Sequence, residues 1–323
     1  GAVRLEEIHT DRLWKRKLKG VYDSEKIKAP IIVTGSARLD LYRKGSDSLL
    51  GRYIPYRLHP FTLGEDPAPP GPDEMFLSER TQICNIEDML TLGGFPEPLF
   101  GGSEDYAKRW SRLRLDRLVQ EDIRDILAVS DLNSFRILAE LLGERVGAPL
   151  SINSLKEDVG RAYATVRSWY QVLEALYYCF TIRPWSKRVN RAIRAEPKMY
   201  LYDHLRISPE RGGANLENLT ALHLLKACDF WTDSAQGEFV LHFVRDKSKR
   251  EVDFLIARDG KPWMLVECKS GLKEPAPALR FFSETLAPQH KYQLVRSKGF
   301  RKHFAAHHGI EVLDYEIFLR QLP

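Results

Sequence analysis

Residues 249–270, KREVDFLIARDGKPWMLVECKS, determine how the C-terminal part of the chain is expected to fold. Apolar side chains alternate with others in two runs, and Asp259-Gly260 between the runs favours a tight turn. We therefore expect a β-hairpin with one apolar face. The residues of that face are Val252, Phe254, Ile256, Met264, Val266 and Cys268.

The same alternation collects charged residues on the other face of the hairpin. Asp253 leaves the face of Val252 and Phe254, because successive side chains of a strand point to opposite sides. Glu267 and Lys269 lie two residues apart, and strands paired about the turn would bring both opposite Asp253. Two carboxylates suit a hard divalent cation such as Mg²⁺ or Mn²⁺. A solvated, charged hairpin without such a site is the alternative.

This arrangement resembles the PD-(D/E)xK nuclease superfamily, in which an acid and a hairpin precede a Glu-x-Lys sequence, here residues 267–269. A helix before the hairpin often carries one more acid in that superfamily, and Glu217 matches its position. The resemblance implies that Asp253, Glu267, Lys269 and Glu217 are catalytic and that Asp253 and Glu267 bind the metal. The alternative for Glu217 is a first-turn glutamate favoured by the helix dipole.

Composition sets outer limits. With 323 residues, of which 43% are hydrophobic, the chain can form two or three domains with a sizeable core. A formal net charge of +5 permits an acidic partner without identifying one. Four scattered cysteines without CxxC spacing predict a reducing, cytoplasmic environment and argue against a zinc site. No apolar run approaches ~20 residues, so we expect no membrane span.

Four short elements near the N-terminus occur in the order of a known ATPase core. They are Leu5–His9, Val33–Ser36, Gly51-Arg52 and Leu58–Phe61. Together they resemble the second half of an AAA-type ATPase core, in particular that of prokaryotic ATPases with a C-terminal domain of unknown function 4143. The resemblance implies a Walker B strand, a sensor strand and an arginine finger in these elements.

Four residues receive roles from this resemblance. Glu6 stands where the family has the aspartate that positions Mg²⁺, and Glu7 would activate the attacking water. Ser36 would be the sensor, and Arg52 an arginine finger or, alternatively, a surface cation. Because the chain contains no G-x-x-x-x-G-K-[ST] loop, we expect residues 1–323 not to bind ATP tightly. We expect ATP to bind only in a full-length protein that includes that loop. The alternative is that the N-terminal part is a natural remnant that never binds nucleotide.

The middle of the chain has a different composition. Residues 67–127 are expected to form a Pro-rich linker and a helical segment, and residues 128–203 a winged helix-turn-helix. The loop between its two wing strands, residues 183–194, has five cations and no acid, which is typical of a nucleic-acid-binding segment. The residues expected to contact DNA are Lys187, Arg188, Arg191 and Arg194. Packing or dimerisation through this module is the alternative.

The predicted fold is α/β and multidomain, with a partial AAA-type core over 1–66 and a restriction-endonuclease-like domain over 204–323. Two functions stay open. The first is a Mg²⁺- or Mn²⁺-dependent hydrolase that cuts or processes DNA and is coupled to an ATPase module. The second is a catalytically inactive regulatory ATPase that binds DNA or protein. A homo-oligomer is compatible with either function.

Overall fold

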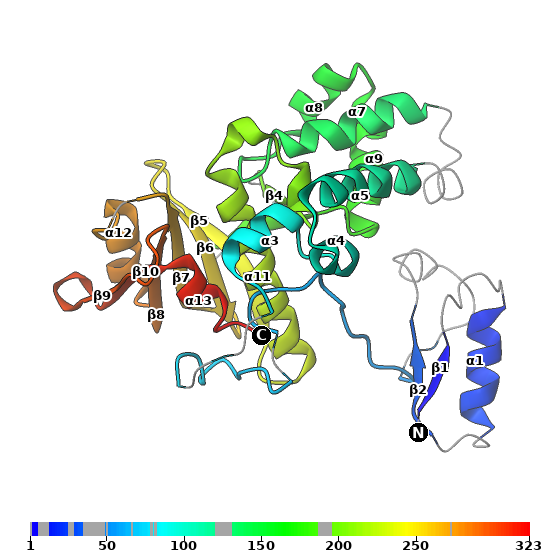
Figure 1. The fold of residues 1–323 in the computed structure, drawn as a ribbon, viewed down its shortest axis with the longest axis horizontal. Coiled ribbons are helices and arrows are strands. Elements are labelled where there is room, and N and C mark those ends of the chain that lie inside the picture. Colours follow the sequence, from blue (N-terminus) through cyan, green and yellow to red (C-terminus); the bar gives the residue numbers. More distant parts are fainter. Residues whose placement is uncertain are drawn as a thin grey trace.

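Figure 1 shows the fold of the chain, a computed structural model that describes residues 2–5, 13–24, 29–34, 49, 51–65, 67–77, 80, 83–119, 131–186, 196–271 and 273–323. Three parts follow one another: a small N-terminal unit, a helical middle, and a large sheet with helices on both faces. The expected α/β, multidomain architecture is confirmed. None of the described helices is long and apolar enough to cross a membrane.

The N-terminal unit contains a small parallel sheet and a helix. β1 (Val3–Leu5) pairs with β2 (Ile31–Val33), and α1 (Trp14–Asp23) lies between them in sequence. The pairing continues beyond β2, because the N–H of Thr34 donates a 2.9 Å hydrogen bond to the carbonyl of Leu5. A connection of this length is what parallel pairing requires. Figure 1 shows the unit to one side, joined to the rest by an extended segment.

The described residues form six helices in the middle part, and four of them, α3, α5, α7 and α8, begin at a side-chain cap. Their bounds are α3 Ile86–Leu92, α4 Pro96–Gly101, α5 Glu104–Arg117, α7 Leu132–Gly143, α8 Ile152–Val159 and α9 Tyr163–Ala175. Asn85, Ser103 and Asp131 each accept a hydrogen bond from a backbone N–H of the first turn, which the helix itself leaves without a partner. Gly160 ends α8 in the left-handed conformation, as expected.

An eight-stranded mixed sheet joins the middle of the chain to its C-terminal part. Its strands are β3 Cys179–Pro184, β4 Lys198–Leu201, β5 Phe239–Arg245, β6 Glu251–Arg258, β7 Lys261–Lys269, β8 His290–Val295, β9 Arg301–Phe304 and β10 Ile310–Asp314. They lie in the order β4-β3-β5-β6-β7-β8-β10-β9. β3 pairs antiparallel with β4 and parallel with β5. The strands expected as a wing therefore belong to the same sheet as the C-terminal strands.

The hairpin expected about Asp259-Gly260 is confirmed. β6 and β7 pair antiparallel, and the two turn residues adopt φ values of 50° and 75°. Two successive left-handed residues give the turn the twist that a tight hairpin needs. Phe254 and Ile256 enter one core, whereas Leu255 and Ala257 enter the core on the other face. Alternation therefore holds in the middle of β6.

The expected face of Val252 is wrong, and a β-bulge is the reason. Val252 belongs to the core on the opposite face from Phe254. At this point β5 advances by two residues while β6 advances by three. Asp253 and Phe254 consequently both face side chains of β4, Lys198 and Tyr200 respectively. The extra residue thus places Asp253 on the same side of the sheet as Phe254, whereas strict alternation would place it on the opposite side.

Helices cover both faces of the sheet. α11 (Ala214–Asp233) packs on β4, β5 and β6, and α13 (Tyr315–Leu319) packs on β8 and β10. α12 (Pro277–Leu286) packs on β6 and β7 from the opposite face. Figure 1 shows α11 between the sheet and the middle helices, which explains why it is buried around most of its circumference. Short 3₁₀ turns lie at His204–Arg206, Pro209–Arg211 and Ala305–His307.

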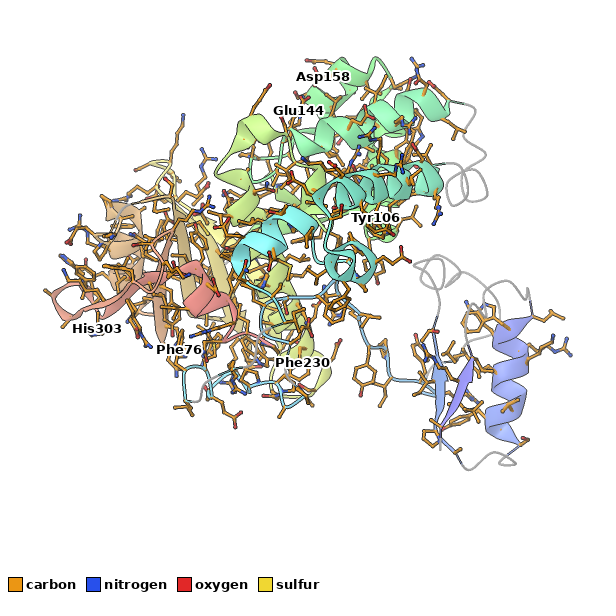
Figure 2. All side chains as sticks on the ribbon, in the orientation of Figure 1. Phe76, Tyr106, Glu144, Asp158, Phe230 and His303 are labelled. Carbon is orange, nitrogen blue, oxygen red and sulfur yellow. The ribbon has the colours of Figure 1, made fainter. Side chains whose placement is uncertain are left out.

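The Pro-rich segment that follows the N-terminal unit packs on the C-terminal part instead of forming a free linker. The indole N–H of Trp231 donates a 3.0 Å hydrogen bond to the carbonyl of Pro70. The N–H of Phe76 donates a 3.0 Å hydrogen bond to Gln321 Oε1, and the ring centres of Phe76 and Phe318 lie 6.5 Å apart. Figure 2 labels Phe76. Backbone and side-chain contacts together therefore hold this segment in place.

His223 fixes residues just before that segment to α11. Its Nδ1 donates to the carbonyl of Leu219 at 2.8 Å, and its Nε2 accepts the N–H of Leu63 at 3.0 Å. Burial lowers the pKa of His223 to about 3, so the ring stays neutral. We expect His223→Leu to lower the free energy of unfolding by about 1–3 kcal/mol, because the buried Leu63 N–H loses its partner. Urea denaturation measures this, with the exposed His303→Leu as control. Equal stability of the two variants would contradict it.

Candidate active site

β6 and β7 separate beyond the pair Phe254–Val266, and two carboxylates occupy the opening. Continuing the register by one residue places Asp253 opposite Glu267. Glu267 Oε2 accepts the N–H of Asp253 at 3.2 Å, and Asp253 Oδ2 accepts the N–H of Cys268 at 2.9 Å. These bonds take the place of backbone bonds between the strands. The strand ends therefore hold Asp253 and Glu267 together.

Lys269 lies beside this pair of carboxylates. Its Nζ forms an ion pair with Glu267 Oε1, and Tyr315 donates a 3.4 Å hydrogen bond to the carbonyl of Lys269. The side chain of Glu267 is 4% exposed and that of Lys269 is 36% exposed. Lys269 is thus the solvent-exposed member of its ion pair with Glu267.

Glu217 reaches Asp253 from the first turn of α11, where the helix dipole favours a carboxylate. Its Oε1 accepts a 2.8 Å hydrogen bond from the hydroxyl of Tyr200. The backbone of Gly147, with φ +74°, passes so close that a Cβ there would lie 2.8 Å from Glu217 Oε1. A glycine at this turn therefore leaves the space that the Glu217 carboxylate occupies.

Lys198, the first residue of β4, places its ammonium among three carboxylates. Its Nζ lies 2.8 Å from Glu251 Oε1. Glu217 Oε1 and Asp253 Oδ1 are 3.5 and 3.6 Å from the same nitrogen. The Lys198 side chain is 3% exposed, and its ammonium lies 5.5 Å from the ring centre of Phe243. The ammonium is therefore a buried cation that several acids share.

The acids of this cluster affect one another's protonation. Burial and the charge of Asp253 raise the pKa of Glu217 and of Glu267 to about 7. Burial lowers the pKa of Lys198, but the neighbouring carboxylates outweigh it and leave that pKa above its ordinary value. Lys198 therefore stays charged, while the two glutamates titrate near neutral pH.

These two glutamates predict a dependence of stability on pH. Their pKa in the folded chain lies above the ordinary 4.5, so the folded state holds protons that the unfolded state has released. Their contribution to stability is present below pH 4.5 and is lost as the pH rises through about 7. From about pH 5 to pH 8, wild type should lose on the order of 2 kcal/mol of unfolding free energy for each of the two glutamates, relative to Glu217→Gln/Glu267→Gln. Denaturant titrations at several pH values measure the difference, and parallel pH profiles would disprove it.

The donors in the cluster fit a hard divalent cation. Asp253 and Glu267 supply carboxylate oxygens, and Mg²⁺ is usually held by one or two carboxylates together with water and substrate phosphates. Among the residues that the structure describes, no three His, Cys, Asp or Glu side chains are arranged to hold a metal ion. A metal ion at Asp253 and Glu267 would therefore keep several water ligands.

The other predicted site residues lie away from this cluster or beyond what is described. Arg52 forms a surface ion pair with Asp23, with 3.0 Å between Nε and Oδ1, and its side chain is 31% exposed. In this structure Arg52 is a surface cation. The residues outside the described part of the chain are Glu6, Glu7, Ser36, Lys187, Arg188, Arg191 and Arg194.

Lys198 and Tyr200 received no site role from the sequence, although both contact Glu217. Their spacing of two residues places them on one face of β4. A usable signal was present, because β4 is otherwise apolar and a lysine is rarely buried without an acidic partner. Glu251 was missed as well, although it lies two residues before Asp253.

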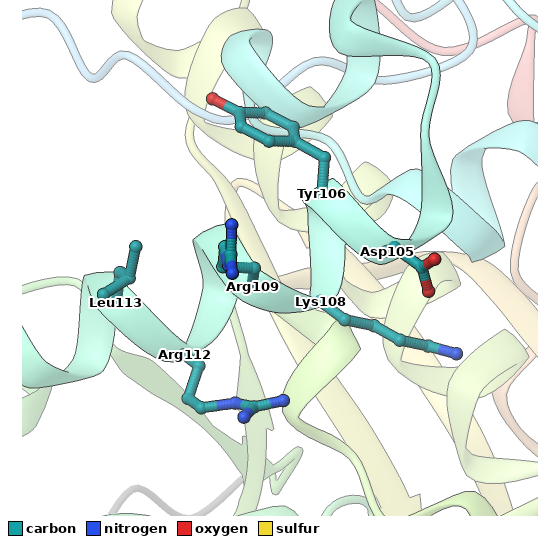
Figure 3. A pocket seen from close by; sticks show the side chains of 6 residues that line it. All are labelled: Asp105, Tyr106, Lys108, Arg109, Arg112 and Leu113. Atoms are coloured by element: carbon teal, nitrogen blue, oxygen red, sulfur yellow. The ribbon is translucent and has the colours of Figure 1, made fainter.

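A separate hollow of about 700 Å³ lies on the surface of α5 (Figure 3). Its lining consists of Asp105, Tyr106, Lys108, Arg109, Arg112 and Leu113. All six lining residues that the structure describes come from one helix, so no second described element contributes side chains to the hollow. The carboxylate cluster is therefore the better candidate for chemistry.

Family models match three parts of the chain. An AAA domain matches residues 2–66, and domains of unknown function match residues 84–204 (DUF8612) and 212–315 (DUF4143). No curated protein and no solved structure matches the chain. Glu217, Asp253, Glu267 and Lys269 all lie within the DUF4143 match. An AAA domain at the N-terminus and a DUF4143 domain at the C-terminus are the domain order of an AAA-type ATPase with a C-terminal DUF4143 domain, and the chain matches that order.

Proposed function

We propose that this protein is a divalent-metal-dependent nuclease that hydrolyses DNA phosphodiesters and is coupled to an AAA-type ATPase module. One observation carries the proposal: Glu217 from α11, Asp253 from β6, and Glu267 and Lys269 from β7 converge on one cluster. Strand ends that hold two acids by backbone hydrogen bonds, next to an ammonium, provide the oxygen donors and the cation that phosphodiester hydrolysis requires.

Each residue of the cluster has a role in this proposal. Asp253 and Glu267 hold Mg²⁺ or Mn²⁺, which supplies polarisation of the phosphodiester and lowers the pKa of a bound water. Lys269, the most exposed charged group of the cluster, orients that water or stabilises charge on the phosphoryl oxygens. Glu217 lies at the edge of the cluster, beside Asp253.

The balance of charge supports a cation at this position. Above the pKa of about 7 of the two glutamates, three ionised carboxylates face two ammonium groups, which leaves one negative charge. Glu251 is partly balanced by Arg245, whose Nε lies 3.7 Å away. The carboxylates are Glu217, Asp253 and Glu267, and the ammonium groups are Lys198 and Lys269. A divalent cation would reverse the sign of the site, which would then complement a singly charged phosphodiester.

Titration of the purified chain with Mn²⁺ in a calorimeter tests the proposal directly. We expect saturable binding, and in parallel Mn²⁺-dependent cleavage of at least one of single-stranded, double-stranded and branched DNA. If the chain neither binds Mn²⁺ nor cuts any of these substrates, the nuclease proposal fails.

A binding or regulatory role is the second candidate, and the position of Lys198 favours it. The buried ammonium of Lys198 already neutralises part of the acidic cluster, so the fold does not need a metal ion to hold these carboxylates. In that case the C-terminal domain would be structural, and DNA or protein would bind elsewhere. Absence of both Mn²⁺ binding and cleavage would favour this candidate.

DNA binding in either case is expected to depend on the basic loop between β3 and β4. Changing Arg188, Arg191 and Arg194 together to alanine should weaken binding and reduce the slope of log K against log salt by about three, because fewer counterions are released. Fluorescence anisotropy at several salt concentrations measures both quantities.

A matched control removes three exposed cations from other surfaces, Arg109, Arg112 and Lys298. This variant should retain the affinity and the salt slope of wild type. If the loop variant binds as wild type does, the DNA-binding surface lies elsewhere.

A further inference from the structure

Lys198 stands where a cation is expected in a carboxylate site. Its Nζ has oxygens of Glu251, Glu217 and Asp253 at 2.8, 3.5 and 3.6 Å. A structural ion pair needs one acidic partner, whereas this ammonium has three, from α11 and β6. The side chain is 3% exposed, so water does little to screen its charge.

Asp253 connects this ammonium with the other half of the cluster. Its Oδ1 lies on the Lys198 side, while its Oδ2 accepts the N–H of Cys268 at the opening that Glu267 shares. A divalent ion on the Oδ2 side would give Asp253 a positive charge next to each oxygen, as in sites with two metal ions about 4 Å apart. In this protein the positive charge next to Oδ1 is the ammonium of Lys198.

We propose that Lys198 supplies the second positive charge of the active site, so that a single divalent ion binds, at Asp253 and Glu267. The inference rests on the proposed function for the identity of that single ion. Lys198 acts as a positioning residue, because it holds Glu217 and Asp253 on one side and leaves the other side of Asp253 to the metal. Since Lys198 lies in the DUF8612 match and Asp253 in the DUF4143 match, the site is complete only when both parts are present.

Counting bound Mn²⁺ tests this inference without an activity assay. Wild type should bind one ion per chain in calorimetry. Lys198→Met has a similar volume and no charge, and it should bind two ions. The Mn²⁺ affinity of Lys198→Met should rise by about tenfold or more, because a unit charge a few ångströms away opposes the metal. In electron paramagnetic resonance, the two ions should give the broadened spectrum of a coupled pair.

Two matched variants separate charge from structure. Lys198→Arg retains the charge and should bind one ion. Lys226→Met removes another partly buried lysine, which pairs with Glu65 outside the cluster, and should also bind one ion. If Lys198→Met binds one ion with unchanged affinity, the inference is overturned.

Two further outcomes have different consequences: Lys198→Met fails to fold, or wild type fails to bind Mn²⁺. If Lys198→Met does not fold without metal, Lys198→Met/Glu251→Gln restores the balance of charge and should still bind one ion more than wild type. If wild type binds no Mn²⁺, the proposed function fails, and the inference is then decided separately. In that case one ion gained by Lys198→Met supports the claim that Lys198 occupies the position of a cation, and no gain overturns that claim as well.

Discussion

Asp253→Asn is expected to abolish Mn²⁺-dependent DNA cleavage, with a loss of at least about a hundredfold in rate. The substitution removes the negative charge that both halves of the cluster share. It keeps the shape, because an amide oxygen can still accept the N–H of Cys268. Repulsion of Glu217 and Glu267 by Asp253 also disappears, so the loss of folding stability should be small. Calorimetry with Mn²⁺ and a cleavage assay measure the two effects separately.

Glu267→Gln should have the same effect, because it removes the other proposed metal ligand. The exposed Glu284→Gln on α12 loses the same charge away from the cluster and should cleave DNA as wild type does. Glu217→Gln is expected to be intermediate, since Glu217 lies at the edge of the site. If Asp253→Asn still cuts DNA, the site is not at this hairpin.

Lys269→Ala is expected to separate metal binding from cleavage. The rate should fall by about 10²- to 10³-fold, because charge on the phosphoryl oxygens loses its stabilising cation. Mn²⁺ should bind at least as tightly as in wild type, since the variant frees Glu267 Oε1 from its ion pair. Calorimetry and single-turnover cleavage on the same preparation measure both results.

Lys261→Ala is the matched control at the other end of β7, where the side chain is exposed. It should leave both binding and cleavage unchanged. Loss of Mn²⁺ binding in Lys269→Ala would mean that Lys269 holds the acids in place and has no role in the chemistry.

The hairpin and helix α12 were predictable because their signals are local. Asp259-Gly260 fixes the turn, and the alternation of apolar residues fixes the strands on either side. Glu217 could be placed near the hairpin only through the family resemblance, because nothing local relates a helix to a strand more than 30 residues away. The pairing of Asp253 with Glu267 depends on more than the turn, because the register of β6 on β7 shifts by one residue between Ile256 and Ala257.

Features that depend on pairing between distant segments were not predictable. The bulge beside Asp253 arises from the pairing of β6 with β5, and the sequence of β6 alone does not mark its position. Lys198 required knowledge that β4 belongs to the same sheet as β6. Helix α9 ends at Ala175, and Tyr177 adopts a left-handed φ of 52°, which its sequence does not signal.

The continuity of the sheet across β3 and β5 determines how this protein can be divided. A fragment that begins at residue 204 would lack β3 and β4, so the backbone groups of β5 would lose their partners along that edge. Apolar surface of α11 that now packs on β4 would also be exposed to water. Such a fragment should aggregate or remain partly unfolded, and it would lack Lys198 and Tyr200 from the acidic cluster. The smallest autonomous folding unit that contains the intact cluster therefore begins before β3, within the helical middle of the chain.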